Sequence, residues 1–212
     1  MRRDAGRRAP AENGPDAMRM PGRRILVVGT SGSGKTTTAR RLARALGYVH
    51  VELDALHWGP DWTPAPDAVF RHRVHEATSG RCWVVDGNFT RVRDIVWPVA
   101  DTVVWLDYPL PVILGRLLRR TARRVFLRER LWSGNRESLW RLFTADSIIL
   151  WALKTYRRRR REYAELLARP EYQHLRAIRL RSPTQAEAWL QAVAAVASDT
   201  RARDSPVTLE AP

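Results

Sequence analysis

Several residue types are nearly absent from this 212-residue chain, and each absence excludes a class of protein. The chain has one cysteine, Cys82, so it forms no intrachain disulfide and lacks the framework of a small disulfide-rich secreted domain. No stretch approaches the roughly 18 consecutive apolar residues that a membrane-spanning helix needs. The basic N-terminus lacks the apolar core of a signal peptide. We therefore expect a cytoplasmic protein that does not insert into a membrane.

Lysine is also scarce: the chain has only Lys35 and Lys154, against 35 arginines. The formal net charge is +15, and most of it lies within residues 112–161, where fourteen arginines and one lysine face three acidic residues. A concentrated positive field attracts polyanions such as nucleotides, RNA or DNA. A solvated basic helix face would give the same composition, so the charge by itself selects no ligand.

The polar composition of both ends predicts one domain with loose termini. Residues 1–22 are rich in Arg, Ala, Gly and Pro without apolar periodicity, and we expect a disordered leader there. Residues 198–212 are expected to be a disordered tail. The domain is expected to cover residues 23–197, with a mainly helical, Arg-rich insertion at 111–168.

Short apolar runs that predict strands alternate with segments of helical periodicity. Strands are expected at Arg24–Val28, Tyr48–Leu53, Trp83–Val85, Thr102–Leu106 and Arg176–Leu180. Helices are expected at Lys35–Leu46, Pro66–Thr78 and Thr184–Ala197. This alternation predicts an α/β fold with a parallel sheet. Cys82 begins one of the apolar runs and is expected to be a buried strand residue.

The strongest motif lies between the first expected strand and helix, at residues 29–36. It reads Gly-Thr-Ser-Gly-Ser-Gly-Lys-Thr and matches G-x-x-x-x-G-K-[ST] in full. Glycines let the backbone curl so that its N–H groups point at phosphate oxygens, and the helix N-terminus adds partial positive charge. Lys35 would reach the β- and γ-phosphates and Thr36 would ligate Mg²⁺. The expected nucleotide-binding residues are Gly29, Thr30, Ser31, Gly32, Ser33, Gly34, Lys35, Thr36 and Thr37.

A Gly/Ser-rich turn that contains this pattern by chance is the alternative. Four fixed positions recur by chance in under about one in a hundred chains of this length. One of the only two lysines in the chain, Lys35, occupies the position where the motif requires lysine. Both facts favour a phosphate-binding loop.

Three aspartates follow expected strands: Asp54, Asp86 and Asp107. Phosphoryl transfer needs carboxylates to hold Mg²⁺ or to take a proton from the acceptor. In a parallel α/β sheet the site lies at the carboxyl ends of the strands. Asp54 and Asp86 are therefore candidate site residues, with helix capping as the alternative. Asp107 is expected to be structural or hinge-like.

At this point the residues resemble a known family, the adenylate-kinase-like P-loop kinases, and most closely the bacterial topology-modulation proteins within it. The resemblance covers about residues 23–192 and is carried by four segments. These are the P-loop, the Glu-Leu-Asp-Ala-Leu-His-Trp segment at 52–58, the Asp-Gly-Asn-Phe-Thr-Arg segment at 86–91, and the strand at 100–107 that leads to Arg116 and Arg120.

The resemblance implies a P-loop NTPase three-layer sandwich, with a five-stranded parallel sheet and an Arg-rich helical lid at 111–168. It also implies an acceptor site beside Asp54 and Arg91, and lid arginines such as Arg116 and Arg120 over the phosphates. Arginine suits that task because its planar fork binds phosphate oxygens in pairs. A solvated helix face is the alternative for each lid arginine. The expected catalytic set is Lys35, Asp54, Asp86, Arg91 and Arg120.

Together these features predict an ATP- and Mg²⁺-dependent phosphotransferase that acts on a nucleotide, a nucleoside or another small acceptor. The alternative is an ATP-binding protein that associates with nucleic acid through its basic insertion. No feature of the sequence fixes the acceptor or the oligomeric state.

Overall fold

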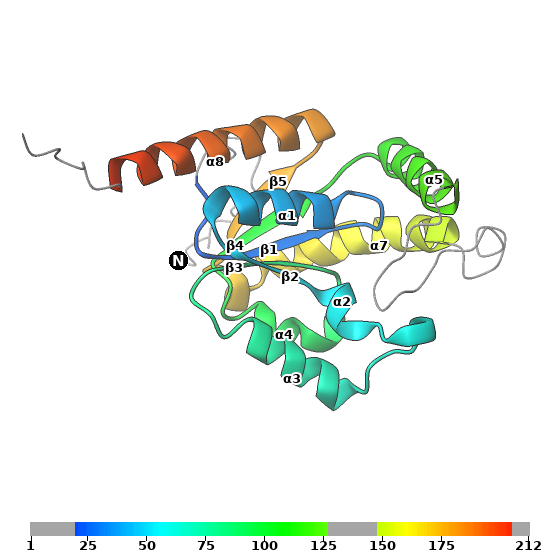
Figure 1. Ribbon diagram of the computed structural model, residues 1–212. Coiled ribbons are helices and arrows are strands. Elements are labelled where there is room, and N and C mark those ends of the chain that lie inside the picture. The colour runs from blue at the N-terminus through cyan, green and yellow to red at the C-terminus, as the bar shows by residue number, and fades with distance from the viewer. Residues whose placement is uncertain (1–19, 127–147, 205–212) are drawn as a thin grey trace, which may run out of the picture.

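Five short runs of buried, mostly β-branched residues form one parallel sheet (Figure 1). The strands are β1 (Arg24–Gly29), β2 (Val49–Glu52), β3 (Trp83–Asp86), β4 (Thr102–Leu106) and β5 (Arg176–Leu180). Their spatial order is β2-β3-β1-β4-β5, and every neighbouring pair is parallel. This computed structural model describes residues 20–126 and 148–204. The predicted α/β fold with a five-stranded parallel sheet is confirmed.

Helices cover both faces of the sheet (Figure 1). Their bounds are α1 (Lys35–Leu46), α2 (Leu53–His57), α3 (Asp67–Ala77), α4 (Arg93–Val96), α5 (Leu110–Phe126), α7 (Ile148–Ala168) and α8 (Pro183–Asp204). Short 3-10 turns lie at Pro60–Trp62, Thr90–Val92 and Pro170–Tyr172. Of the predicted insertion at 111–168, α5 and α7 are seen, and residues 127–147 lie outside the described residues. None of the described helices is long and apolar enough to cross a bilayer.

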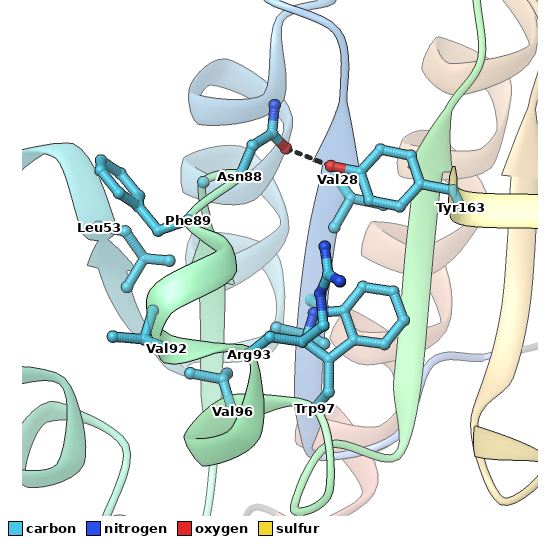
Figure 2. Close-up of a pocket in the computed structure, with 11 residues that line it drawn as sticks. Val28, Leu53, Asn88, Phe89, Val92, Arg93, Val96, Trp97 and Tyr163 are labelled. Carbon is cyan, nitrogen blue, oxygen red and sulfur yellow. Dashed lines mark hydrogen bonds between the residues drawn. The ribbon is translucent and has the colours of Figure 1, made fainter. Parts of the chain in front are cut away.

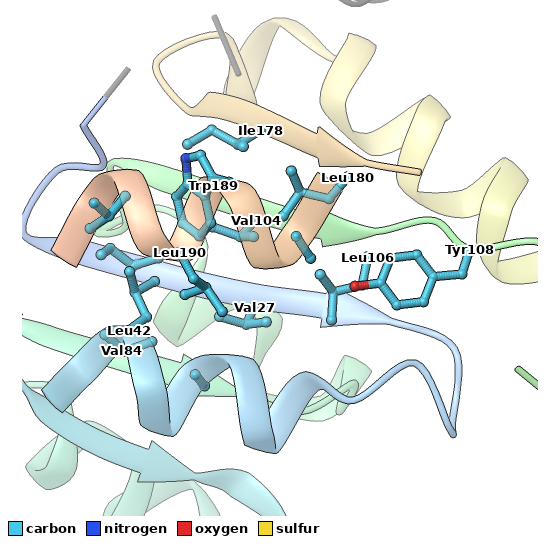
Figure 3. Close-up of a cluster of buried hydrophobic side chains, with 14 of the residues drawn as sticks. Val27, Leu42, Val84, Val104, Leu106, Tyr108, Ile178, Leu180, Trp189 and Leu190 are labelled. Atoms are coloured by element: carbon cyan, nitrogen blue, oxygen red, sulfur yellow. The ribbon is translucent and has the colours of Figure 1, made fainter. Parts of the chain in front are cut away.

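Successive residues of a strand point to opposite faces of the sheet, and this alternation divides the core in two. Ile25 and Val27 of β1 pack with α1 and α8 in one hydrophobic cluster, shown in Figure 3. Leu26 and Val28 pack with α3, α4 and α7 in the other cluster. Both faces of β1 are therefore buried, which explains its continuous apolar run.

The element boundaries differ from the predicted ones mainly at the ends of the chain. The last helix was expected to stop at Ala197, but α8 continues to Asp204 because it packs along α1, where Arg201 donates a hydrogen bond to the carbonyl of Ala45. Residues 198–204 of the predicted tail are thus helical. At the other end, the backbone N–H of Gly22 donates to Thr102 Oγ1 at 2.9 Å. Cys82 is only partly buried and directly precedes β3.

Asp107, which directly follows β4, forms ion pairs with Arg160 of α7 and Arg179 of β5. These contacts agree with the expectation that Asp107 is structural. Its side chain is 1% exposed, and Arg160 of α7 approaches Oδ1 with Nε at 2.6 Å. Arg179 of β5 approaches Oδ2 with Nη2 at 2.5 Å and stacks over Trp105. A buried carboxylate shared by two guanidiniums fixes helix α7 against the edge of the sheet.

Asp107→Ala is expected to lower the free energy of unfolding by about 3 kcal/mol, because it leaves two cations without their buried partner. Urea denaturation followed by circular dichroism measures this loss. Asp94→Ala is the matched control: Asp94 pairs with Arg71 at an exposed surface, and its loss is expected to cost less than about 1 kcal/mol. Equal losses in the two variants would contradict the anchoring role of Asp107.

Candidate active site

The predicted phosphate loop forms a tight bend between β1 and α1. Gly32 and Gly34 have φ angles of 84° and 90°, in the left-handed region that glycine adopts without strain. A Cβ on Gly32 would lie 2.5 Å from Cγ of Leu117, so space as well as backbone conformation requires glycine there. The backbone N–H of Ser33 donates to the carbonyl of Thr30 at 3.0 Å. The bend leads directly into the N-terminus of α1, the arrangement that binds phosphate.

Lys35, the first residue of α1, places its ammonium among charged groups from four other elements. Its Nζ donates to the carbonyl of Thr30 at 3.3 Å. Burial lowers its pKa to about 8, and the nearby Asp54 and Asp86 oppose this shift while Arg159 and Arg120 add to it. The ammonium at the start of the helix, beside the glycine bend, is placed to receive the negative oxygens of a phosphate.

Asp86 and Thr36 meet where β3 ends beneath α1. Thr36 Oγ1 donates to Asp86 Oδ1 at 3.0 Å, and the Asp86 side chain is 1% exposed. Hydroxyl and carboxylate oxygens are the ligands that Mg²⁺ prefers in proteins. These two residues therefore fit a Mg²⁺ ion that is bound together with a nucleotide, and the metal would neutralise phosphate charge there.

Asp54 lies in the first turn of α2, at the carboxyl end of β2, and is mostly buried. Desolvation raises the pKa of this carboxyl above its usual range, and Asp86 adds to the rise. The nearby Lys35, a hydrogen bond with the Trp58 side chain and Arg120 act in the opposite direction. A carboxylate with a raised pKa beside a phosphate-binding lysine has the property of a general base.

Arg120 belongs to the predicted catalytic set, and its positive charge lowers the pKa of both Lys35 and Asp54. Arg116, also predicted to lie over the phosphates, instead donates to the carbonyl of Ser33 at 2.8 Å and lies over the ring of Tyr108. Arg116 thus contacts the backbone of the loop through the Ser33 carbonyl. Thr37 is the only exposed residue of the predicted loop set, while Ser31 is partly buried.

Arg159 is a site residue that sequence reasoning did not single out. It lies in the run of five arginines at 157–161, where periodicity alone does not identify the one that faces the loop. In the fold, the charge of Arg159 acts on Lys35, and its Nη1 donates to the hydroxyl of Tyr163 at 3.4 Å. The neighbouring Arg157, Arg158 and Arg161 are exposed.

Arg91 was expected beside the acceptor, but the neighbouring Arg93, which the sequence analysis did not consider, is the more buried of the two. The Arg91 side chain is 53% exposed and lies 3.6 Å from Asp67 at the surface. Arg93, two residues later on α4, is 20% exposed, pairs with Glu162 of α7 and faces a pocket. The motif at 86–91 includes Arg91 and so predicted a role for that residue. Arg93 begins the one-turn helix α4, and this helix directs its side chain toward the pocket.

The pocket lies beside the end of β1, between α4 and α7 (Figure 2). Most of its lining residues are apolar, and Asn88, Arg93 and Tyr163 contribute polar groups. The lining residues are Leu26, Val28, Leu53, Gly87, Asn88, Phe89, Val92, Arg93, Val96, Trp97 and Tyr163.

A chain of hydrogen bonds connects this pocket to the phosphate loop. Tyr163 OH donates to Asn88 Oδ1 at 2.7 Å (Figure 2), and Asn88 Nδ2 donates to the carbonyl of Gly29 at 2.7 Å. Leu53 and Gly87, which line the pocket, directly adjoin Asp54 and Asp86 in the sequence. The pocket and the glycine loop therefore lie close to each other.

Comparison with known proteins shows which family the chain matches. The profile of the family described as AAA domain matches residues 25–211. Shikimate kinase from Synechococcus elongatus is 35% identical over 107 residues, which are 44% of this chain and 56% of the relative. Shikimate kinase from Synechococcus sp. strain CC9902 is 53% identical over 125 residues, 52% of this chain and 65% of the relative.

The fold itself also has a counterpart among solved structures. Shikimate kinase from Bacteroides thetaiotaomicron superposes with a TM-score of 0.50 at 16% identity, covering 83% of this chain and 98% of that one. At this identity the likeness concerns the fold alone. The chain spans little more than half the length of the first-mentioned curated relative.

Proposed function

The chain belongs to the AAA domain family, and from this premise we propose that it is an ATP-dependent kinase that phosphorylates a hydroxyl group of a small molecule. One observation supports this most directly: the Lys35 ammonium lies among Asp54, Asp86, Arg120 and Arg159, beside a glycine loop that opens a helix. The arrangement brings phosphate-binding groups and a candidate base into one place. ATP use also suggests the cytoplasm as the site of action.

In the proposed reaction the loop at 29–36 would bind the triphosphate, and Thr36 with Asp86 would hold Mg²⁺. The acceptor hydroxyl transfers its proton to Asp54 while its oxygen attacks the γ-phosphorus. The bond between that phosphorus and the bridging oxygen breaks, and ADP leaves with the electron pair. Lys35 and Arg120 stabilise the charge that develops on the transferred group, so catalysis is mainly positioning and electrostatics.

The proposed acceptor site lies next to the pocket of Figure 2, whose lining includes Leu53 and Gly87, the sequence neighbours of Asp54 and Asp86. The hydrogen bonds from Tyr163 to Asn88 and from Asn88 to the Gly29 carbonyl fix the position of this pocket relative to the phosphate loop. Asn88, Arg93 and Tyr163 supply the polar groups that would orient the acceptor. The relatives named shikimate kinase make small hydroxy acids the first acceptors to test.

The proposal is tested by incubating the protein with ATP, Mg²⁺ and a panel of acceptors that includes shikimate, sugar acids, nucleosides and nucleotides. Mass spectrometry would show an acceptor heavier by one phosphoryl group, in amounts equal to the ADP formed. ADP production with every acceptor left unmodified would contradict the proposed transfer. Absence of ATP binding would contradict the site itself.

Arg93→Gln is expected to raise KM for the acceptor about tenfold and to leave KM for ATP nearly unchanged, because one charge-assisted contact contributes about 1.5 kcal/mol or more. Steady-state kinetics with the acceptor found in the panel measures both constants. Arg91→Gln, the same change at the exposed neighbouring arginine, is the matched control. If Arg91→Gln raised the acceptor KM and Arg93→Gln did not, the original interpretation of the motif at 86–91 would hold instead.

Two finer interpretations remain predictions. The similarity to topology-modulation proteins is not supported by the relatives described above, whose names are those of shikimate kinases. Nucleic acid binding by the basic insertion also stays a prediction, since residues 127–147 of that insertion lie outside the described part of the chain.

A further inference from the structure

We propose that His50 is a positioning residue for the metal: it holds Asp86 in the orientation in which this carboxylate and Thr36 bind Mg²⁺. His50 Nε2 lies 2.7 Å from Asp86 Oδ2. The inference rests on the proposed function, since it assumes that the protein uses Mg·ATP.

The parallel register of β2 and β3 explains how the two side chains meet. His50 pairs with Val84, and Glu52 pairs with Asp86, so His50 and Asp86 are diagonal neighbours on adjacent strands. Residues two apart on a strand share a face, and Val84 belongs to the cluster beneath α1. His50 and Asp86 therefore lie on the face of the sheet that α1 covers, where Thr36 lies in the first turn of that helix.

Asp86 uses its two oxygens in different ways. Oδ1 accepts from the Thr36 hydroxyl at 3.0 Å, and Oδ2 accepts from His50. A carboxylate has no proton to donate, so the ring N–H of His50 must be the donor. With Oδ2 occupied, rotation of the carboxylate is restricted and Oδ1 stays directed toward Thr36.

Burial makes this restriction important. The Asp86 side chain is 1% exposed and that of His50 is 18% exposed. Loss of the imidazole would leave Oδ2 without this donor in a site that water reaches poorly. Partners that orient a metal-binding carboxylate typically change metal affinity by ten- to a hundredfold when they are removed.

A purely structural role for His50 is the competing explanation, because a polar residue on an edge strand often only satisfies its neighbour. The two roles differ in what they change. A structural contact affects stability and all ligands alike, whereas a positioning contact affects the metal and leaves metal-free nucleotide binding intact.

The test uses Mn²⁺ as a paramagnetic probe with the full-length protein and ATP. Electron paramagnetic resonance measures the free Mn²⁺ and gives its dissociation constant in the ternary complex. His50→Ala is expected to raise that constant about tenfold. His50→Gln places an amide donor near the position of Nε2 and is expected to restore most of the affinity.

Two further measurements separate this effect from others. Binding of ATP in the presence of EDTA, measured by calorimetry, is expected to be the same in His50→Ala as in the unmodified protein. His72→Ala removes a histidine whose side chain is 73% exposed on α3, and it is expected to leave Mn²⁺ affinity unchanged.

An unchanged Mn²⁺ dissociation constant in His50→Ala would overturn the positioning role. So would equal weakening of metal-free ATP binding, since this would indicate a structural contact. If the unmodified protein bound no ATP at all, the proposed function would fail instead, and the two failures are thus distinguishable.

Discussion

Lys35→Ala is expected to reduce kcat/KM for phosphoryl transfer by about 10²- to 10³-fold. Removal of one charged group directed at the developing negative charge typically costs this much. The nearby Arg120 and Arg159 extend from α5 and α7 and not from the phosphate loop, so we expect that they do not replace the Lys35 ammonium in the variant. Steady-state kinetics with the acceptor identified in the panel measures the loss.

The chain provides its own control for this variant, because its only other lysine is Lys154. Lys154 is exposed on α7, so Lys154→Ala makes the same change in composition and net charge at a solvated position. It is expected to keep kcat/KM within about twofold, as surface substitutions usually have small effects. Phosphoryl transfer by Lys35→Ala at the unmodified rate would contradict the role of the loop.

Asp54→Asn is expected to lower kcat by about 10²- to 10⁴-fold, the usual contribution of a positioned general base. Asparagine has nearly the same shape as aspartate but cannot accept the hydroxyl proton. KM for ATP is expected to change little, because Lys35 and the loop backbone remain in place. Kinetics at saturating ATP and acceptor would show the loss in kcat.

The raised pKa of Asp54 gives this variant two further signatures. The base must be ionised to act, so the rate of the unmodified protein falls as pH drops through this raised pKa, and the fall begins at a higher pH than for an ordinary carboxyl. A carboxyl whose pKa is raised by folding destabilises the protein above that pKa, and this cost disappears as pH falls through it. Asp54→Asn is therefore expected to match or exceed the unmodified protein in Tm at neutral pH.

Asp61→Asn is the matched control for the same chemistry outside the site. Asp61 is exposed in the loop after α2 and has a φ angle of 53°, a conformation that asparagine tolerates well. Its kcat and pH profile are expected to equal those of the unmodified protein. A marked fall in Tm in Asp54→Asn, with kcat retained, would assign Asp54 a structural role in place of a catalytic one.

The glycine bend and the sheet were predictable because their signals are local. A buried strand, a glycine bend and an amphipathic helix follow one another within residues 24–46, and backbone conformation dictates which residue types stand there. The strands were recognisable by apolar runs, and their parallel arrangement followed from alternation with helices. The end of α8 was missed because residues 198–204 have little apolar periodicity, and contacts with α1 stabilise them as a helix.

The sequence by itself determined the fold class, the glycine bend before the first helix and the aspartates at the strand ends, since each depends on neighbours within a few residues. Only the tertiary structure decided that Asp107 anchors α7, that Arg93 and not Arg91 faces the pocket, and that His50 holds Asp86. Those assignments depend on strand register and helix rotation, which bring together residues far apart in the chain. Interactions of this kind are set by packing across the sheet, and no local pattern encodes them.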